Sequence, residues 1–181
     1  MKKNRLSLLL VLIIVSALFF SGCASVTGNV TTNEKDQKLE EKEMAYDFML
    51  LDLSGNTHNL SDYQGKKVYI KFWGTWCPVC VSGLNELTAL DEQLKDSDTV
   101  VLTIVAPGIS GEMSEEKFKD WYSKQGYSFE VLLDPTAESF IEYGIRAFPT
   151  SAFVASDGTL SAVKIGHQSN DAIKDILESM D

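Results

Sequence analysis

Two cysteines separated by two residues, Cys77 and Cys80, stand between an apolar segment and a helical pattern. This arrangement constrains the fold more than any other feature of the chain. Residues 68–73 predict a buried strand, and apolar residues at helical spacing predict a helix over 77–94. Cys77 would then lie at a helix N-terminus, where unpaired N–H groups and the helix dipole favour an anion.

The position at the helix start predicts which cysteine reacts first. The thiolate is the nucleophilic form of cysteine, and a helix N-terminus lowers a thiol pKa, so Cys77 is the expected nucleophile. Cys80 follows one turn later on the same side and can close a short disulfide. Pro78 suits the first turn, because its missing N–H costs nothing there. The motif therefore predicts dithiol–disulfide exchange.

Two other interpretations of the cysteine pair remain open. Such a pair can be half of a zinc site, but zinc requires about four ligands. Cys23, His58 and His167 lie far apart in the sequence with no ligand spacing, so we expect no metal. A purely structural disulfide is the second alternative.

The first 22 residues are typical of a secretory signal, with three basic residues before an apolar run over 6–20. That run is shorter than the ~20 residues of a membrane span. Residues 21–24 resemble a bacterial lipobox, although Phe20 stands where leucine is usual, and imply cleavage before Cys23 and lipid on its thiol. An uncleaved anchor is the alternative. Both place the remainder outside the cytoplasmic membrane, where disulfides form.

The mature chain divides into a tether and one domain. Residues 23–44 are small, polar and charged, which predicts a flexible tether, with a short amphiphilic helix as the alternative. Residues 45–181 have the size of one compact domain. The formal charge is −10, and it becomes −13 without the first 22 residues, which carry three basic and no acidic residues. This acidity argues against nucleic acid and against electrostatic docking on anionic lipid.

Strand and helix patterns alternate along the domain and end in a hairpin and a helix. This order predicts an α/β fold with a mixed central sheet flanked by helices and an N-terminal β-hairpin extension. Besides 68–73, the expected strands are 48–53, 57–60, 99–106, 129–133, 150–155 and 160–165. Besides 77–94, the expected helices are 114–125, 136–143 and 169–180.

The segment 72–80, Phe-Trp-Gly-Thr-Trp-Cys-Pro-Val-Cys, together with Phe-Pro-Thr at 148–150, resembles the thioredoxin superfamily. Upstream motifs between 47 and 67 are similar to those of the TlpA/ResA-like extracytoplasmic branch. The segment 100–121 resembles the surface thioredoxin-like lipoproteins that serve methionine sulfoxide reductase. The resemblance covers essentially all of 45–181 and implies a thioredoxin fold there.

The resemblance also implies residue roles. Cys77 would attack a partner disulfide, and Cys80 would resolve the mixed disulfide. Trp76 would cover the pair, and Pro149 would be the cis-proline beside it, whose backbone pairs with an incoming peptide as a strand does. The further residues expected to support the site or contact a partner are Pro78, Phe148, Thr150, Lys71 and Ile109.

Two positions depart from the family pattern. Thioredoxins proper carry a buried acid where this chain has Lys71, and some relatives carry Glu where Gly83 stands. Proton transfer to Cys80 would therefore lack the usual carboxylate. Lys71 is either a cation that favours the Cys80 thiolate or a side chain whose stem packs while its ammonium reaches solvent.

The loop 107–113 is the other candidate for the site. It follows a strand that should run parallel to 68–73, and the carboxyl ends of parallel strands share one edge of a sheet. Ile109 in this loop would then border Cys77 and help to select the partner. A plain strand-to-helix connector is the alternative.

A peroxidase built on the same general fold is a sharper alternative for the chemistry. It would need Pro and Thr seven and three residues before its cysteine. Before Cys77 these positions hold Ile70 and Gly74, and before Cys80 they hold Trp73 and Cys77. The sequence therefore argues against a peroxidase.

We expect a monomeric thiol–disulfide reductase, lipid-anchored at the outer face of the bacterial cytoplasmic membrane, with no cofactor besides its dithiol. The resemblance implies electrons from a CcdA-type membrane thiol transporter and their transfer to methionine sulfoxide reductase. A disulfide-forming oxidase of exported proteins is the alternative within the same chemistry, since the motif does not reveal redox direction. A surface-binding lipoprotein with an incidental disulfide is the alternative from another class.

Overall fold

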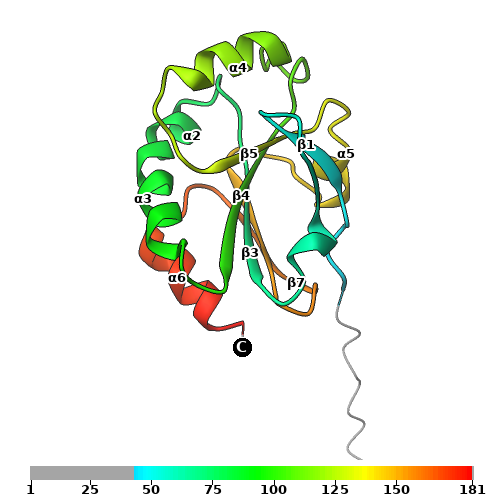
Figure 1. Cartoon of the computed structure of the whole chain (residues 1–181), viewed down its shortest axis with the longest axis vertical. Helices are drawn as coiled ribbons and strands as arrows, with labels where there is room; N and C mark the ends of the chain where they lie inside the picture. Colours follow the sequence, from blue (N-terminus) through cyan, green and yellow to red (C-terminus); the bar gives the residue numbers. More distant parts are fainter. Residues whose placement is uncertain (1–42, 181) are drawn as a thin grey trace, which may run out of the picture. The chain divides into compact units, whose positions relative to one another are not determined.

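Seven strands form one mixed sheet in residues 43–180, the part of the chain that the computed structural model describes (Figure 1). The spatial order is β2-β1-β5-β4-β3-β6-β7. β3, β4 and β5 run parallel, and the remaining neighbours pair antiparallel. The strands are β1 (Met49–Asp52), β2 (Thr57–Asn59), β3 (Lys67–Phe72), β4 (Thr99–Val105), β5 (Glu130–Leu133), β6 (Thr150–Val154) and β7 (Leu160–Ile165).

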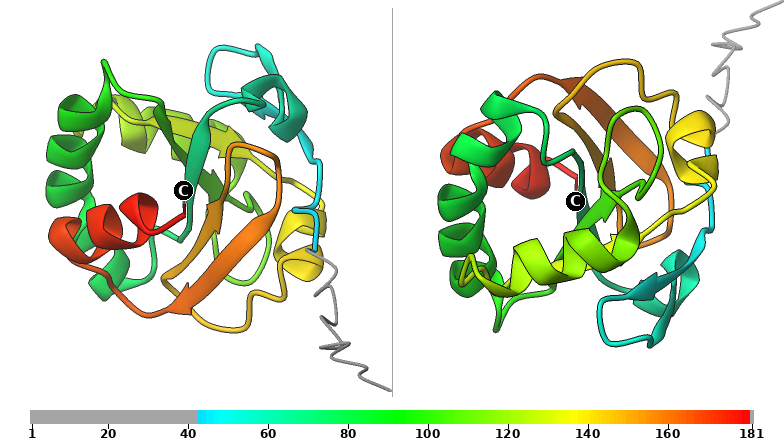
Figure 2. Two further views of the ribbon diagram at one scale, coloured as in Figure 1. Left: turned by 90° about the horizontal axis from the view of Figure 1, so that it is seen from below. Right: turned by 90° about the horizontal axis from the view of Figure 1, so that it is seen from above.

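Helices cover both faces of this sheet, and Figure 2 shows the sheet between the two layers. Side chains of α2, α3, α4 and α6 pack with Tyr69 of β3 and with Trp73, which directly follows this strand. Side chains of α5 and η1 pack with Ile70 and Phe72 on the opposite face. The predicted mixed sheet, flanking helices and N-terminal hairpin are confirmed. The helical elements are η1 (Leu60–Tyr63), α2 (Pro78–Ser82), α3 (Leu84–Leu94), α4 (Glu115–Ser123), α5 (Glu138–Glu142) and α6 (Asn170–Glu178).

The predicted signal 1–22, Cys23 and most of the predicted tether lie outside the described residues. The described segment begins with residues that already pair with the rest of the domain. Met44 forms a β-bridge with Thr159, and Ala45 N–H donates to the Gly158 carbonyl at 3.0 Å. Within residues 43–180, no helix combines the length and the apolar character that a membrane span requires.

The single helix predicted over 77–94 is broken at Gly83 into α2 and α3. Gly83 has φ −92° and ψ 1°, and its N–H donates to the Cys80 carbonyl at 3.2 Å. A Cβ at this position would lie 2.8 Å from His167 Cε1, closer than two carbons can pack. The apolar periodicity continues across the break, so the local pattern does not reveal it.

The connection between β5 and α5 depends on the fully buried carboxylate of Asp134. It accepts hydrogen bonds from Thr136 N (3.2 Å), Thr136 Oγ1 (2.9 Å) and Ser139 N (2.8 Å), and also from Ser139 Oγ. Ala137 between them adopts φ +55°, a conformation that costs energy for a residue with a Cβ. The Asp134 hydrogen bonds hold the chain in this turn.

We expect Asp134→Ala to lower the free energy of unfolding by about 3 kcal/mol, because the buried N–H and hydroxyl of Ser139 would lose their acceptor and the turn its other hydrogen bonds. Urea unfolding followed by circular dichroism measures the change. Asp120→Ala is the matched control, since Asp120 forms an exposed i,i+4 pair with Lys124 on α4. That variant should lose about 0.5 kcal/mol or less. Equal losses in the two variants would contradict the role of Asp134.

Candidate active site

Cys77 and Cys80 form a disulfide directly after β3, with a Cα–Cα distance of 5.2 Å. Cys77 is the N-cap of α2, Pro78 is the first helical residue, and Cys77 Sγ accepts a hydrogen bond from Cys80 N at 3.2 Å. Cys80 is fully buried, whereas Cys77 retains 6% of its exposure. Cys77 is therefore the cysteine that a disulfide substrate can reach more readily.

The peptide bond between Phe148 and Pro149 is cis, and it leads directly into β6. Thr150 at the start of β6 pairs with Phe72 at the end of β3, so the proline lies beside the segment that enters the dithiol. The Thr150 side chain is buried, and its hydroxyl donates to the Ala147 carbonyl at 2.7 Å. The Thr150 side chain therefore presents almost no surface to a partner.

An exposed apolar surface surrounds the disulfide. Trp76 is 47% exposed and Val79 is 54% exposed. The Trp76 ring packs edge-to-face on Phe148 with 5.4 Å between centroids. Next to Trp76 a cleft of about 400 Å³ is lined by Ile109, Phe148 and residues of α5. A protein partner that approaches Cys77 would cover these side chains.

The loop 107–113 does border the dithiol, as the parallel pairing of β3 and β4 predicts. The residue that holds the loop there is Glu112, which the sequence analysis did not identify. Its carboxylate accepts hydrogen bonds from Thr75 N and Thr75 Oγ1, both at 2.6 Å, and from Met113 N at 2.8 Å. Glu112 thus fixes the turn that precedes Trp76 and Cys77. The weak sequence signal is that Glu112 is the sole acid in this loop.

Behind the disulfide, Lys71 is held within the domain with 3% exposure. Burial lowers the pKa of the Lys71 ammonium, and the negative charge of Glu86 opposes this shift. His167, from the loop after β7, lies nearby, and its Nε2 is 3.1 Å from Glu86 Oε2. The sequence predicts no role at the dithiol for Glu86, which is one of several acids on the helix, or for His167, which is far from the motif along the chain.

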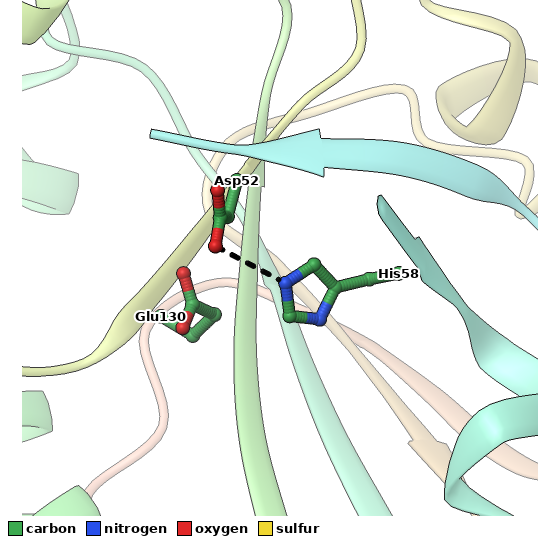
Figure 3. Close-up of side chains that lie close together, drawn as sticks. All are labelled: Asp52, His58 and Glu130. Atoms are coloured by element: carbon green, nitrogen blue, oxygen red, sulfur yellow. Dashed lines mark hydrogen bonds and ion pairs between the residues drawn. The ribbon is translucent and has the colours of Figure 1, made fainter. Parts of the chain in front are cut away.

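A second group of titratable side chains, shown in Figure 3, consists of Asp52, His58 and Glu130. His58 Nε2 lies 3.4 Å from Asp52 Oδ2, and one donor atom from each of the three residues lies within 4.8 Å of the others. Asp52 also accepts hydrogen bonds from Ser54 N (2.8 Å), Asn56 N (2.8 Å) and Asn56 Nδ2 (2.7 Å). These bonds shape the β1–β2 turn, so Asp52 has a structural role in the hairpin.

Glu112→Ala should slow insulin reduction with dithiothreitol about tenfold. Without the Glu112 carboxylate, the turn at Thr75 would lose its hydrogen bonds, and Cys77 would no longer be held in position. The variant should remain folded by circular dichroism. Glu116→Ala, on the exposed face of α4, is the matched control and should react like the unaltered protein. An unchanged rate in Glu112→Ala would remove Glu112 from the site.

The lowered pKa of Asp52 predicts that the free energy of unfolding depends on pH. Burial raises its pKa, but hydrogen bonds from Asn56, His58 and Ser54 outweigh burial and lower the pKa to about 2. Because the folded-state pKa lies below the ordinary value near 4, the ionised carboxylate stabilises the fold fully above about pH 4. This contribution is lost as the pH falls towards 2.

The stability difference between the unaltered protein and Asp52→Asn should therefore be constant from pH 7 to about 4 and vanish towards pH 2. Urea unfolding across this range measures it. A difference that does not change with pH would show that the Asp52 charge makes no contribution.

Comparison with known proteins supports the geometry. The family model described as AhpC/TSA family matches residues 42–163. The thiol-disulfide oxidoreductase ResA of Geobacillus thermodenitrificans is 31% identical over 139 residues, 75% of each chain. An uncharacterized protein of Haemophilus influenzae is 37% identical over 129 residues, 71% of this chain and 82% of that protein.

A solved structure is also similar. The pneumococcal exposed lipoprotein thioredoxin Etrx1 of Streptococcus pneumoniae shares 42% identity, covers 74% of this chain and 99% of its own, and superposes with a TM-score of 0.70. With the dithiol at the end of β3 and a cis-proline beside it, this chain belongs to the AhpC/TSA family, has a thioredoxin fold and is a thiol–disulfide oxidoreductase of the TlpA/ResA type.

Proposed function

We propose that this protein is a reductase tethered outside the cytoplasmic membrane that passes electrons from a CcdA-type membrane thiol transporter to methionine sulfoxide reductase. The observation that carries the chemistry is the disulfide whose more accessible sulfur, Cys77, caps a helix beside an exposed apolar surface. The lipobox-like residues 21–24 support the tether. The similarity to Etrx1, described as an exposed lipoprotein thioredoxin, supports the location.

In the proposed cycle, the Cys77 thiolate attacks one sulfur of a partner disulfide and releases the other as a thiolate. The Cys80 thiolate then attacks Cys77 Sγ, which closes the Cys77–Cys80 disulfide and releases the second partner sulfur. The partner gains two electrons and the dithiol loses two. The membrane transporter restores the dithiol by the reverse exchange.

The partner surface of this proposal is the apolar rim of the dithiol. Trp76 and Val79 are exposed, and Ile109 and Phe148 line the adjacent cleft. An approaching reductase would bury these side chains and align a peptide with the backbone next to Pro149. The burial would favour binding by roughly 25 cal/mol for each Å² of apolar surface removed from water.

Trapping tests the proposal in cells. Cys80→Ser in the full-length protein should accumulate a mixed disulfide with methionine sulfoxide reductase, because the resolving thiol is missing. Non-reducing electrophoresis and mass spectrometry of the adduct identify the partner. Cys77→Ser is the matched control and should trap nothing. The reverse pattern would exchange the roles of the two cysteines.

Two further measurements complete the test. Adding Ile109→Asp to the trap should reduce the reductase adduct but not the adduct with glutathione, whereas Met49→Asp, on the distant hairpin, should change neither. Alkylation of intact cells should find Cys77 and Cys80 mainly as thiols. A mainly oxidised pair in cells would instead identify a disulfide-forming oxidase.

A further inference from the structure

In the proposed cycle the buried thiol of Cys80 must lose its proton before its sulfur can react. To attack Cys77 Sγ it must be a thiolate, but its side chain is fully buried among apolar residues such as Leu84 and Leu87. Burial disfavours the charged form of a thiol. A titratable group near Cys80 is therefore needed to remove the proton and carry it to water.

The position of Gly83, three residues after Cys80, shows which groups are near. A Cβ placed on Gly83 would lie 2.8 Å from His167 Cε1, 2.9 Å from His167 Nδ1 and 3.7 Å from Lys71 Nζ. Gly83 N–H in turn donates to the Cys80 carbonyl. The imidazole and the ammonium thus converge where a side chain at residue 83 would extend.

The His167 ring is held in this position by Glu86. Glu86 Oε2 lies 3.1 Å from His167 Nε2, and Glu86 Oε1 accepts a hydrogen bond from Asn170 N at 3.1 Å. Asn170 Nδ2 also donates to the Glu86 carbonyl at 2.8 Å. The side chains of His167 and Glu86 are 35% and 40% exposed, so this pair is in contact with water, whereas Lys71 is not.

We propose that His167, oriented by Glu86, is the group through which the Cys80 proton exchanges with solvent, and that Lys71 stabilises the thiolate that remains. In the resolving step the Cys80 proton passes to the imidazole, the thiolate attacks Cys77 Sγ, and the partner sulfur leaves with the bonding electron pair. The imidazolium then releases the proton to water. The inference rests on the proposed function only in that Cys80 is the resolving thiol.

The other titratable side chains around this site are neutral or paired with each other. Tyr69 on β3 donates to or accepts from Ser151 Oγ at 2.9 Å, and burial raises its pKa to about 12, so it stays neutral. On α6, Asp171 and Lys174 pair with each other at 3.6 Å, and Asp171 is almost fully exposed. Lys71 and His167 are then the titratable groups next to Gly83, with Glu86 paired to the imidazole.

The reaction of the reduced protein with 5,5′-dithiobis(2-nitrobenzoic acid) separates the two thiols. The first phase forms the Cys77 mixed disulfide, and the second phase is the attack of Cys80, with one thionitrobenzoate released in each. His167→Gln should slow the second phase about tenfold or more and leave the first unchanged. The pH profile of the second phase should also lose one inflection, because the group that takes up the proton would be gone.

Matched variants distinguish proton exchange from a structural role. His58→Gln alters the other histidine and should leave both phases unchanged. Gly83→Ala should slow the second phase as His167→Gln does, because its Cβ would displace the imidazole without altering it. Gly83→Glu combined with His167→Ala should restore the second phase, with its inflection moved to the range of carboxylates.

A second phase that keeps its rate and inflection in both His167→Gln and Gly83→Ala would overturn the inference. So would a reduced rate in which the inflection persists, since His167 would then act only on packing. These results are independent of the biological partner. A normal second phase in the unaltered protein with no trapped methionine sulfoxide reductase would count against the proposed function alone.

Discussion

The pairing of β3 with two neighbours is the constraint on which the rest of the structure depends. β4 runs parallel to β3, so the loop after β4 arrives at the edge where β3 delivers the dithiol. β6 runs antiparallel, so its first residue, Thr150, pairs with Phe72 and sets Pro149 at the same edge. Three segments distant in sequence meet there because of strand register alone, and Glu112 then joins two of them through Thr75.

One side of the site is buried under helices, and the other side is exposed to solvent. Tyr69 and Trp73 pack under α2 and α3 with Cys80, and Lys71 lies between them on the same face. The attacking sulfur lies at the rim of this layer, beside the exposed Trp76. The resolving sulfur lies inside it, where charge is costly, and the proposed route of its proton to water passes the helix break at Gly83.

Much of this could be predicted from the sequence, because it follows from short-range patterns. The apolar run over 68–73 predicted the strand that carries Lys71, and helical spacing assigned Cys77 to a helix start. The break at Gly83 and the contacts of Glu112 and His167 could not be predicted in this way. They join residues 37 to 81 positions apart, and a single acid or histidine in a polar segment has no periodicity that marks it.

The contacts of residues 43–45 determine at which end of the domain any preceding chain is attached. Glu43 and Ala45 bond to the turn that joins β6 and β7, whereas β6 begins at the cis-proline, about 20 Å of extended strand away. A membrane anchor on the chain before Glu43 would therefore be attached at the end of the domain opposite the dithiol. A flexible tether before Glu43, as the sequence predicts, would leave the dithiol and the exposed Trp76 free to turn towards partners in solution or in the membrane.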